Sequence, residues 1–209
     1  MRTKARTFTP AALIFLFAAL MAASTCGCGG SGDKEDAGQT AENGETSGGG
    51  EEGGGGGTTT EVTLYFRYDT PEKSWLMPEK REVDAAEPCR AAMSALISGP
   101  MPGSSLKPVL PDTVSILGVA LERGVCTVDL SKEVLTDANK VGAGATSEML
   151  ALAAIADTLT GIQGVEKVRL IVEGQQSGMV EGRFVEDFWG HVGLPEFLER
   201  NEEIIFKEG

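Results

Sequence analysis

The chain has 209 residues and a formal net charge of -13, with 31 acidic side chains against 18 lysines and arginines. This length accommodates one folded domain with accessory segments. Nucleic-acid binding requires clustered cations that displace counterions from phosphates, and the sequence has no such cluster. The composition therefore excludes a nucleic-acid partner, and the acidity favours solubility.

Residues 1–27 have the three parts of an export signal. Arg2, Lys4 and Arg6 give a basic start, the apolar run "AALIFLFAALMAA" occupies residues 11–23, and small residues follow it. The run is shorter than the roughly 20 residues that a helix needs to cross a bilayer, which disfavours a permanent transmembrane helix. We interpret residues 1–27 as a lipoprotein-type signal peptide.

Two cysteines, Cys26 and Cys28, end this segment in the stretch "ASTCGCGG". A cysteine directly after such a signal resembles the lipobox of bacterial lipoproteins, in which the thiol carries a diacylglyceryl group. Cys28 follows Gly27, as the lipobox prefers; Cys26 follows Thr25 and is the alternative, and neither has leucine three residues before it. The resemblance predicts a lipid anchor at the outer face of the cell membrane. A plain secretory signal and a chance redox pair are the other interpretations.

Residues 28–60 are rich in glycine and glutamate and contain almost nothing apolar. Such a segment buries too little surface to offset the entropy lost on ordering, so we expect a disordered linker. A flexible chain of this length has an r.m.s. span of roughly 30 Å. The linker would hold a domain, residues 61–209, away from the membrane without fixing its orientation.

The first half of the domain reads as a strand, a loop and a helix. Apolar and polar residues alternate over 61–68, which predicts a strand, and Pro71 and Pro78 mark a loop after it. A helix follows, with Asp84 as its cap, Pro88 in its first turn and Gly99 at its end. Its predicted buried face is Cys89, Ala92, Met93 and Leu96.

The second half reads as a hairpin, a helix and a final strand. The hairpin spans 113–131 and turns near 122–124, with Cys126, Val128 and Leu130 on one face. Next comes a helix capped by Thr146 or Ser147, with Glu148 in its positive first turn. The remaining predicted core positions are Leu152, Ile155 and Leu159 on that helix, then Val168, Leu170 and Val172 on the strand 166–174.

The predicted fold class is α+β. The element order β-α-β-β-α-β predicts a two-layer sandwich, with two helices packed on one face of a four-stranded sheet. The segment from Gln175 onward is irregular, but its Phe184, Phe188, Trp189, Leu194 and Phe197 are apolar enough to pack onto the domain.

An ordered set of motifs resembles the GerMN-domain family of sporulation and spore-germination lipoproteins of Gram-positive bacteria. The motifs are "VTLYF" (62–66), "REV" (81–83), "ALISGP" (95–100), "LPDTVSILGV" (110–119), "GVCTVDLS" (124–131), "DTLTGIQGVEKVRLIVEG" (157–174) and "GHVGLPEFLERNEEI" (190–204). The resemblance covers essentially all of 61–209, which has room for one copy of the domain. It implies a lipid anchor, a fold akin to ring-building modules that assemble side by side, and no established catalytic residue.

The residues themselves offer little catalytic chemistry. His191 is the only histidine, and no Cys or His spacing is typical of a metal site, so we expect neither a metal nor a cofactor. Cys89 and Cys126 are both predicted between helix and sheet, where they can form a disulfide in an exported protein or stay two buried free thiols.

Three functions remain open at this stage. The first is a non-enzymatic module that binds a cell-envelope protein or copies of itself. The second is a small-ligand or peptidoglycan-binding lipoprotein, in which Trp75, Trp189 and Tyr65 stack on sugars. The third is an envelope hydrolase that uses an acid pair, either Asp129 with Glu133 or Glu186 with Asp187, although adjacency in sequence does not place two carboxylates in one cleft. The sequence favours the first.

Overall fold

The computed structural model describes residues 58–142 and 144–207. The predicted signal peptide, both candidate lipidation cysteines and nearly all of the predicted linker therefore lie outside the described residues. Strand β1 begins at Thr59, close to the predicted end of the linker.

The first element is a β-hairpin formed by β1 (Thr59–Asp69) and β2 (Ser74–Asp84), which are antiparallel. The predicted inner face is confirmed, since Val62, Leu64 and Phe66 are buried, but Tyr65, predicted on the opposite side, is buried as well. Strand β2 was not predicted, because Pro71 and Pro78 favoured a loop.

Pro78 fits inside β2 because of the hydrogen-bonding pattern of its partner. It lies opposite Tyr65, whose backbone N–H points away from β2 and donates to Thr158 Oγ1 at 3.3 Å. The pair is therefore a non-hydrogen-bonded pair of the antiparallel ladder. The N–H that proline lacks would have pointed outward from an edge strand, so no ladder bond is lost.

A separate mixed sheet has the strand order β3-β4-β5, with β3 Ile116–Glu122, β4 Val125–Leu130 and β5 Lys167–Val172. The predicted hairpin is confirmed: β3 and β4 are antiparallel, and Arg123 and Gly124 form a two-residue turn with φ of 50° and 81°. β5 is parallel to β4. All six residues predicted to face inward from β4 and β5 are buried: Cys126, Val128, Leu130, Val168, Leu170 and Val172.

The two main helices are α1 (Pro88–Ser98) and α3 (Ala145–Thr160), and the short α2 (Glu133–Thr136) and a 3₁₀ turn (Ala138–Val141) lie between β4 and α3. The predicted caps are wrong. Asp84 accepts a hydrogen bond from the Ala86 N–H, before the helix begins. Thr146 and Ser147 lie inside α3, which begins directly after Gly144.

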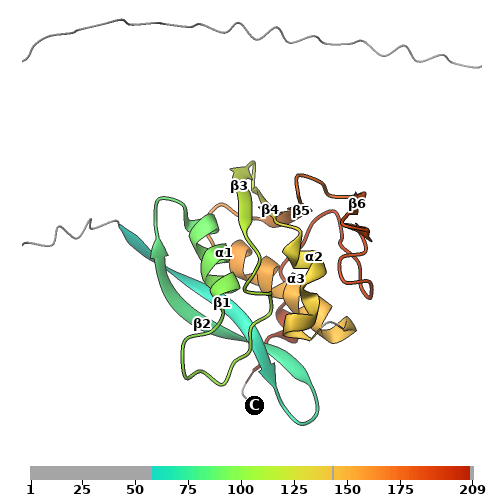
Figure 1. Cartoon of the computed structure of the whole chain (residues 1–209). Helices are drawn as coiled ribbons and strands as arrows, with labels where there is room; N and C mark the ends of the chain where they lie inside the picture. The colour runs from blue at the N-terminus through green and yellow to red at the C-terminus, as the bar shows by residue number, and fades with distance from the viewer. Residues whose placement is uncertain (1–57, 143, 208–209) are drawn as a thin grey trace, which may run out of the picture. The chain divides into compact units, whose positions relative to one another are not determined.

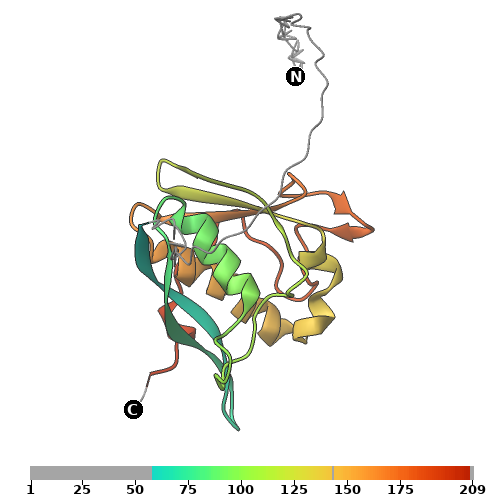
Figure 2. The same ribbon diagram turned by 60° about the vertical axis from the view of Figure 1, so that its left-hand side comes forward.

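α1 and α3 are packed between the hairpin and the mixed sheet, as Figure 1 and Figure 2 show from two directions. α3 contacts β1 and β2 on one side and β5 on the other, and α1 contacts β1, β2 and β3. The predicted four-stranded sheet is therefore not what the described residues form. β1 is paired with β2, so the helices are covered on two faces. The predicted stripe of Leu152, Ile155 and Leu159 is buried, as is most of the rest of α3.

The C-terminal segment packs onto the domain, as predicted. It contains the small hairpin β6 (Met179–Val180) and β7 (Arg183–Phe184) and a 3₁₀ turn at Glu202–Ile204. Phe188 and Trp189 are buried and stacked with ring centroids 5.1 Å apart, whereas Phe184 is 47% exposed. Leu198 forms a bridge to β5.

A polar network ties the tip of the β1–β2 hairpin to the rest of the domain. Asp69 accepts hydrogen bonds from Arg67 at 2.7 Å, from Ser74 at 2.6 Å and from Lys107 at 2.8 Å. Arg67 also donates to Ser147 on α3 at 3.0 Å. The hydrogen bonds from Lys107 and Ser74, with a smaller contribution from Arg67, hold the pKa of Asp69 far below its usual value.

We expect Asp69→Asn to lower the free energy of unfolding at pH 7 by about 1–2 kcal/mol, since charge-assisted hydrogen bonds are lost. Because the pKa of Asp69 is lower in the folded state than in the unfolded state, its carboxylate stabilises the fold fully above the unfolded-state pKa, near pH 4. This stabilisation is lost progressively as the pH falls from there toward the folded-state pKa. The difference between variant and wild type should therefore shrink below about pH 4. Urea unfolding of both proteins from pH 3 to pH 7 measures this difference in the free energy of unfolding. Asp112→Asn, at an 83% exposed side chain, is the control, and a difference independent of pH would contradict the prediction.

Candidate interaction surface

Strand β3 forms an open edge of the mixed sheet. In the part of the chain that the structure describes, β3 pairs only with β4. Leu117 is 49% exposed and Leu121 is 44% exposed, although both belong to a strand. The ladder is irregular between Ile116 and Gly118, where a bulge interrupts the register. An edge strand with apolar side chains and unpaired backbone groups is a template for pairing with another chain.

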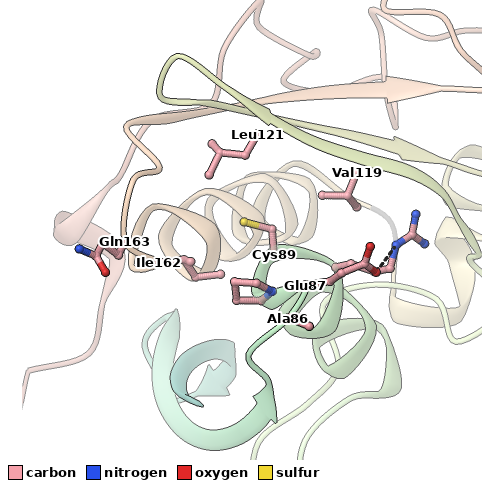
Figure 3. Close-up of a pocket in the computed structure, with 9 residues that line it drawn as sticks. Ala86, Glu87, Cys89, Val119, Leu121, Ile162 and Gln163 are labelled. Atoms are coloured by element: carbon pink, nitrogen blue, oxygen red, sulfur yellow. Dashed lines mark ion pairs between the residues drawn. The ribbon is translucent and has the colours of Figure 1, made fainter. Parts of the chain in front are cut away.

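A small pocket lies beside this edge, between β3 and the first turn of α1 (Figure 3). Val119 and Leu121 point into it from the sheet, and Cys89 and Ile162 lie opposite them. Its volume is about 200 Å³, enough for a few side-chain carbons. The residues lining the pocket are Ala86, Glu87, Pro88, Cys89, Arg90, Val119, Leu121, Ile162 and Gln163.

The rim of the pocket is polar. Glu87 and Arg90 form an ion pair of 3.4 Å, drawn as a dashed line in Figure 3, and Arg90 also donates to the carbonyl of Ile116. An apolar pocket with a polar rim next to a free strand edge suits an extended peptide. The backbone of such a peptide would pair with β3, and one apolar side chain would enter the pocket. We call Leu117, Val119, Leu121 and the pocket the β3 surface.

The two cysteines of the domain lie beneath this surface. Cys89, in the first turn of α1, and Cys126, on β4, are both buried and are free thiols in this structure. They were predicted to face the same layer between helix and sheet, and each thiol is the neighbouring group with the largest effect on the pKa of the other.

His191 belongs to a structural interaction. Its backbone N–H donates to Glu148 Oε2 at 2.8 Å, and its Nδ1 lies 3.2 Å from the same oxygen. The Gly193 N–H donates to Glu148 Oε1 at 2.9 Å. Glu148 is fully buried in the first turn of α3. The carboxylate predicted to interact with the helix dipole therefore holds the C-terminal segment.

The other candidate residues also have structural roles. Asp129 accepts from the Gly174 N–H, and Glu186 accepts from the Gly178 N–H. Tyr65 and Trp189 are buried, and Trp189 donates its Nε1–H to the carbonyl of Val134 at 2.8 Å. Trp75 is partly covered, with the ammonium group of Lys73 3.7 Å from its ring and Phe206 packed edge-on.

The described residues contain neither a metal-binding cluster nor a membrane-spanning helix. No three His, Cys, Asp or Glu side chains among them lie close enough together to hold one metal ion. In the same residues, no helix combines the length and apolarity that a membrane span requires.

The exposed leucines of β3 were not predicted, although the sequence carries a signal for them. The run "ILGVAL" (116–121) is apolar at successive positions, so both faces of the strand are apolar. Such a run is typical of a strand buried on both sides. A strand with this pattern at the edge of a sheet leaves part of its apolar surface uncovered.

Comparison with known proteins assigns the family. The family model described as "Sporulation and spore germination" (Germane) matches residues 63–178, more than half of the chain. The chain belongs to this family, which confirms the resemblance to GerMN domains. No curated protein matches the chain.

Solved structures similar to the chain include the following three. The tandem GerMN domains of the sporulation protein GerM from Bacillus subtilis are 19% identical, with a TM-score of 0.49, over 69% of this chain and 48% of that one. The first GerMN domain of the same protein is 16% identical, with a TM-score of 0.49, over 70% of this chain and 98% of that one. A Clostridium perfringens protein described as a candidate lipoprotein is 28% identical, with a TM-score of 0.40, over 59% of this chain and 79% of that one. The chain thus spans about half of the tandem GerM structure.

We expect Glu148→Ala to lower the free energy of unfolding by about 2–4 kcal/mol, because the N–H groups of His191 and Gly193 lose a buried charged acceptor. Chemical unfolding measures the loss, and hydrogen exchange should be faster at residues 185–193. Glu199→Ala, at an exposed position in the same segment, should change stability by no more than about 0.5 kcal/mol. Equal stability of the two variants would show that Glu148 does not hold the segment.

Proposed function

We propose that the protein is a membrane-anchored extracytoplasmic lipoprotein whose GerMN domain binds another protein and carries out no reaction. Its role would be that of a scaffold in cell-envelope, sporulation or germination processes. The observation that carries the binding function is the open apolar edge of β3 beside its pocket.

The anchor is supported by the sequence. A basic start, a short apolar run and two cysteines precede a glycine-rich segment that begins near Cys28. Cys28 would carry the lipid, with Cys26 as the alternative, and residues 28–60 would be the flexible linker. The domain could then reach partners within roughly 30 Å of the membrane surface.

The binding partner we propose is an envelope protein that offers an extended segment with an apolar side chain. Backbone pairing along β3 would provide affinity, and the pocket would select the side chain. A second copy of this chain is the alternative partner. Both use the same surface, and the mass of a cross-linked product distinguishes them.

Wall-glycan binding has less support. Sugars stack on exposed aromatic faces, but two of the three aromatic residues that suggested this function, Tyr65 and Trp189, are in the core. The proposal of a protein partner is therefore the stronger one.

The anchor is tested with the full chain expressed in a bacterial host. We expect the wild-type protein and Cys26→Ser to partition into the detergent phase of a cloud-point extraction, and Cys28→Ser to move to the aqueous phase. The reverse pattern would assign the lipid to Cys26. A wild-type protein in the aqueous phase would overturn the anchor.

The β3 surface is tested by site-specific photo-crosslinking in intact cells. A photoreactive amino acid at Leu117 should give one discrete adduct, and adding Leu121→Lys should reduce the adduct at least several-fold. The matched control is the same label at Phe184, which is 47% exposed against 49% for Leu117 but lies on β7. Identical adduct patterns at both positions would count against β3 as the binding edge.

A further inference from the structure

Cys89 and Cys126 come together from two layers of the fold. On β4, Cys126 lies directly opposite Leu121 of β3, so both side chains are on the face of the sheet that covers the helices. Leu121 and Cys89 line the same pocket (Figure 3). Cys126 is therefore directly behind the pocket that Cys89 and Leu121 line, and each cysteine is the neighbouring titratable group of the other.

The two thiols differ in access. Cys89 is 6% exposed and forms part of the pocket wall, whereas Cys126 has no exposed surface. A reagent that enters the pocket meets Cys89 first.

The two thiols also differ in acidity. The neighbouring Cys126 thiol lowers the pKa of Cys89, because it stabilises the Cys89 thiolate. The same contact, together with burial, raises the pKa of Cys126. The thiolate is the nucleophile in thiol–disulfide exchange, so Cys89 is the residue that starts the reaction.

We propose that Cys89 and Cys126 form an intramolecular disulfide when the folded protein meets a disulfide oxidant. The Cys89 thiolate attacks one sulfur of the oxidant, which releases one thiolate and leaves a mixed disulfide in the pocket. Cys126 passes its proton to a leaving thiolate and attacks the Cys89 sulfur, which releases the second half of the oxidant. Two protein thiols are oxidised and one external disulfide is reduced to two thiols.

The bond would link α1 to β4 across the interface of helix and sheet. It would close the chain from residue 89 to residue 126, a segment that contains β3. A covalent link across so long a loop restricts the unfolded chain and raises the melting temperature. The inference depends on the packing of the two cysteines and not on the lipid anchor.

The experiment uses the purified, reduced full chain and oxidised glutathione as the oxidant. After alkylation of remaining thiols in denaturant, tryptic digestion without reductant should give residues 82–90 linked to residues 124–132. Cys26 and Cys28 lie in a different tryptic peptide, so their products are separate. The melting temperature of the oxidised protein should exceed that of the reduced protein by about 5–10 °C.

Single variants test the order of the steps. Cys126→Ser should retain one glutathione on Cys89, because nothing displaces it, whereas Cys89→Ser should leave Cys126 unmodified in the folded protein. Circular dichroism verifies that both variants fold. The proposal is overturned if the wild-type cysteines both remain alkylatable after oxidation, or if glutathione adds to both without a cross-link.

Discussion

Helix α3 carries a constraint on which most of the structure depends: it is covered on two sides, yet it contains two acids. Glu148 is fully buried and accepts from the backbone of His191 and Gly193. Asp157 is also fully buried, and its Oδ1 accepts from the Asn201 N–H at 2.7 Å. Its other oxygen has no hydrogen-bond partner among the described residues, and burial raises the pKa of this carboxyl group. Buried acids of this kind are tolerated only where hydrogen-bond donors reach them. The C-terminal segment provides those donors, although it lies beyond the region that the family model matches. It is therefore part of the folded domain and not an appendage.

The position of α3 also explains why the inner face of β3 is only partly covered. α3 packs against β5, at one edge of the mixed sheet, and against the hairpin on its other side. α1 is left to cover the opposite edge, where it contacts β3. Its first turn leaves a pocket beneath Leu121, and no described residue covers Leu117 fully. The partly uncovered inner face of β3 is thus a consequence of how two helices divide the coverage of three strands.

The sequence predicted the elements whose pattern is local. The alternation in β1, β4 and β5, the two-residue turn at Arg123 and the buried face of α1 all follow from short-range periodicity. β2 was missed because proline has no N–H, and only the register with Tyr65 shows that none is needed at Pro78. The four-stranded sheet was wrong for the same reason, since without β2 the strand β1 had no other partner. The interactions of Glu148 join residues far apart in the chain, and no local pattern contains that information.

The apolar pattern of β3 is difficult to explain for a domain that works alone. Edge strands of soluble proteins are commonly protected by charges, prolines or bulges that prevent pairing with other chains. β3 has one bulge near its start, and Glu122 at its end is its only charged residue. β2, by contrast, contains Pro78 and has four charged residues in succession, Glu79, Lys80, Arg81 and Glu82. The same chain therefore protects one edge and leaves the other apolar. A chain of net charge -13 has abundant acids to place on β3. Their absence from Leu117 to Leu121 is the observation on which the proposal of a protein partner rests.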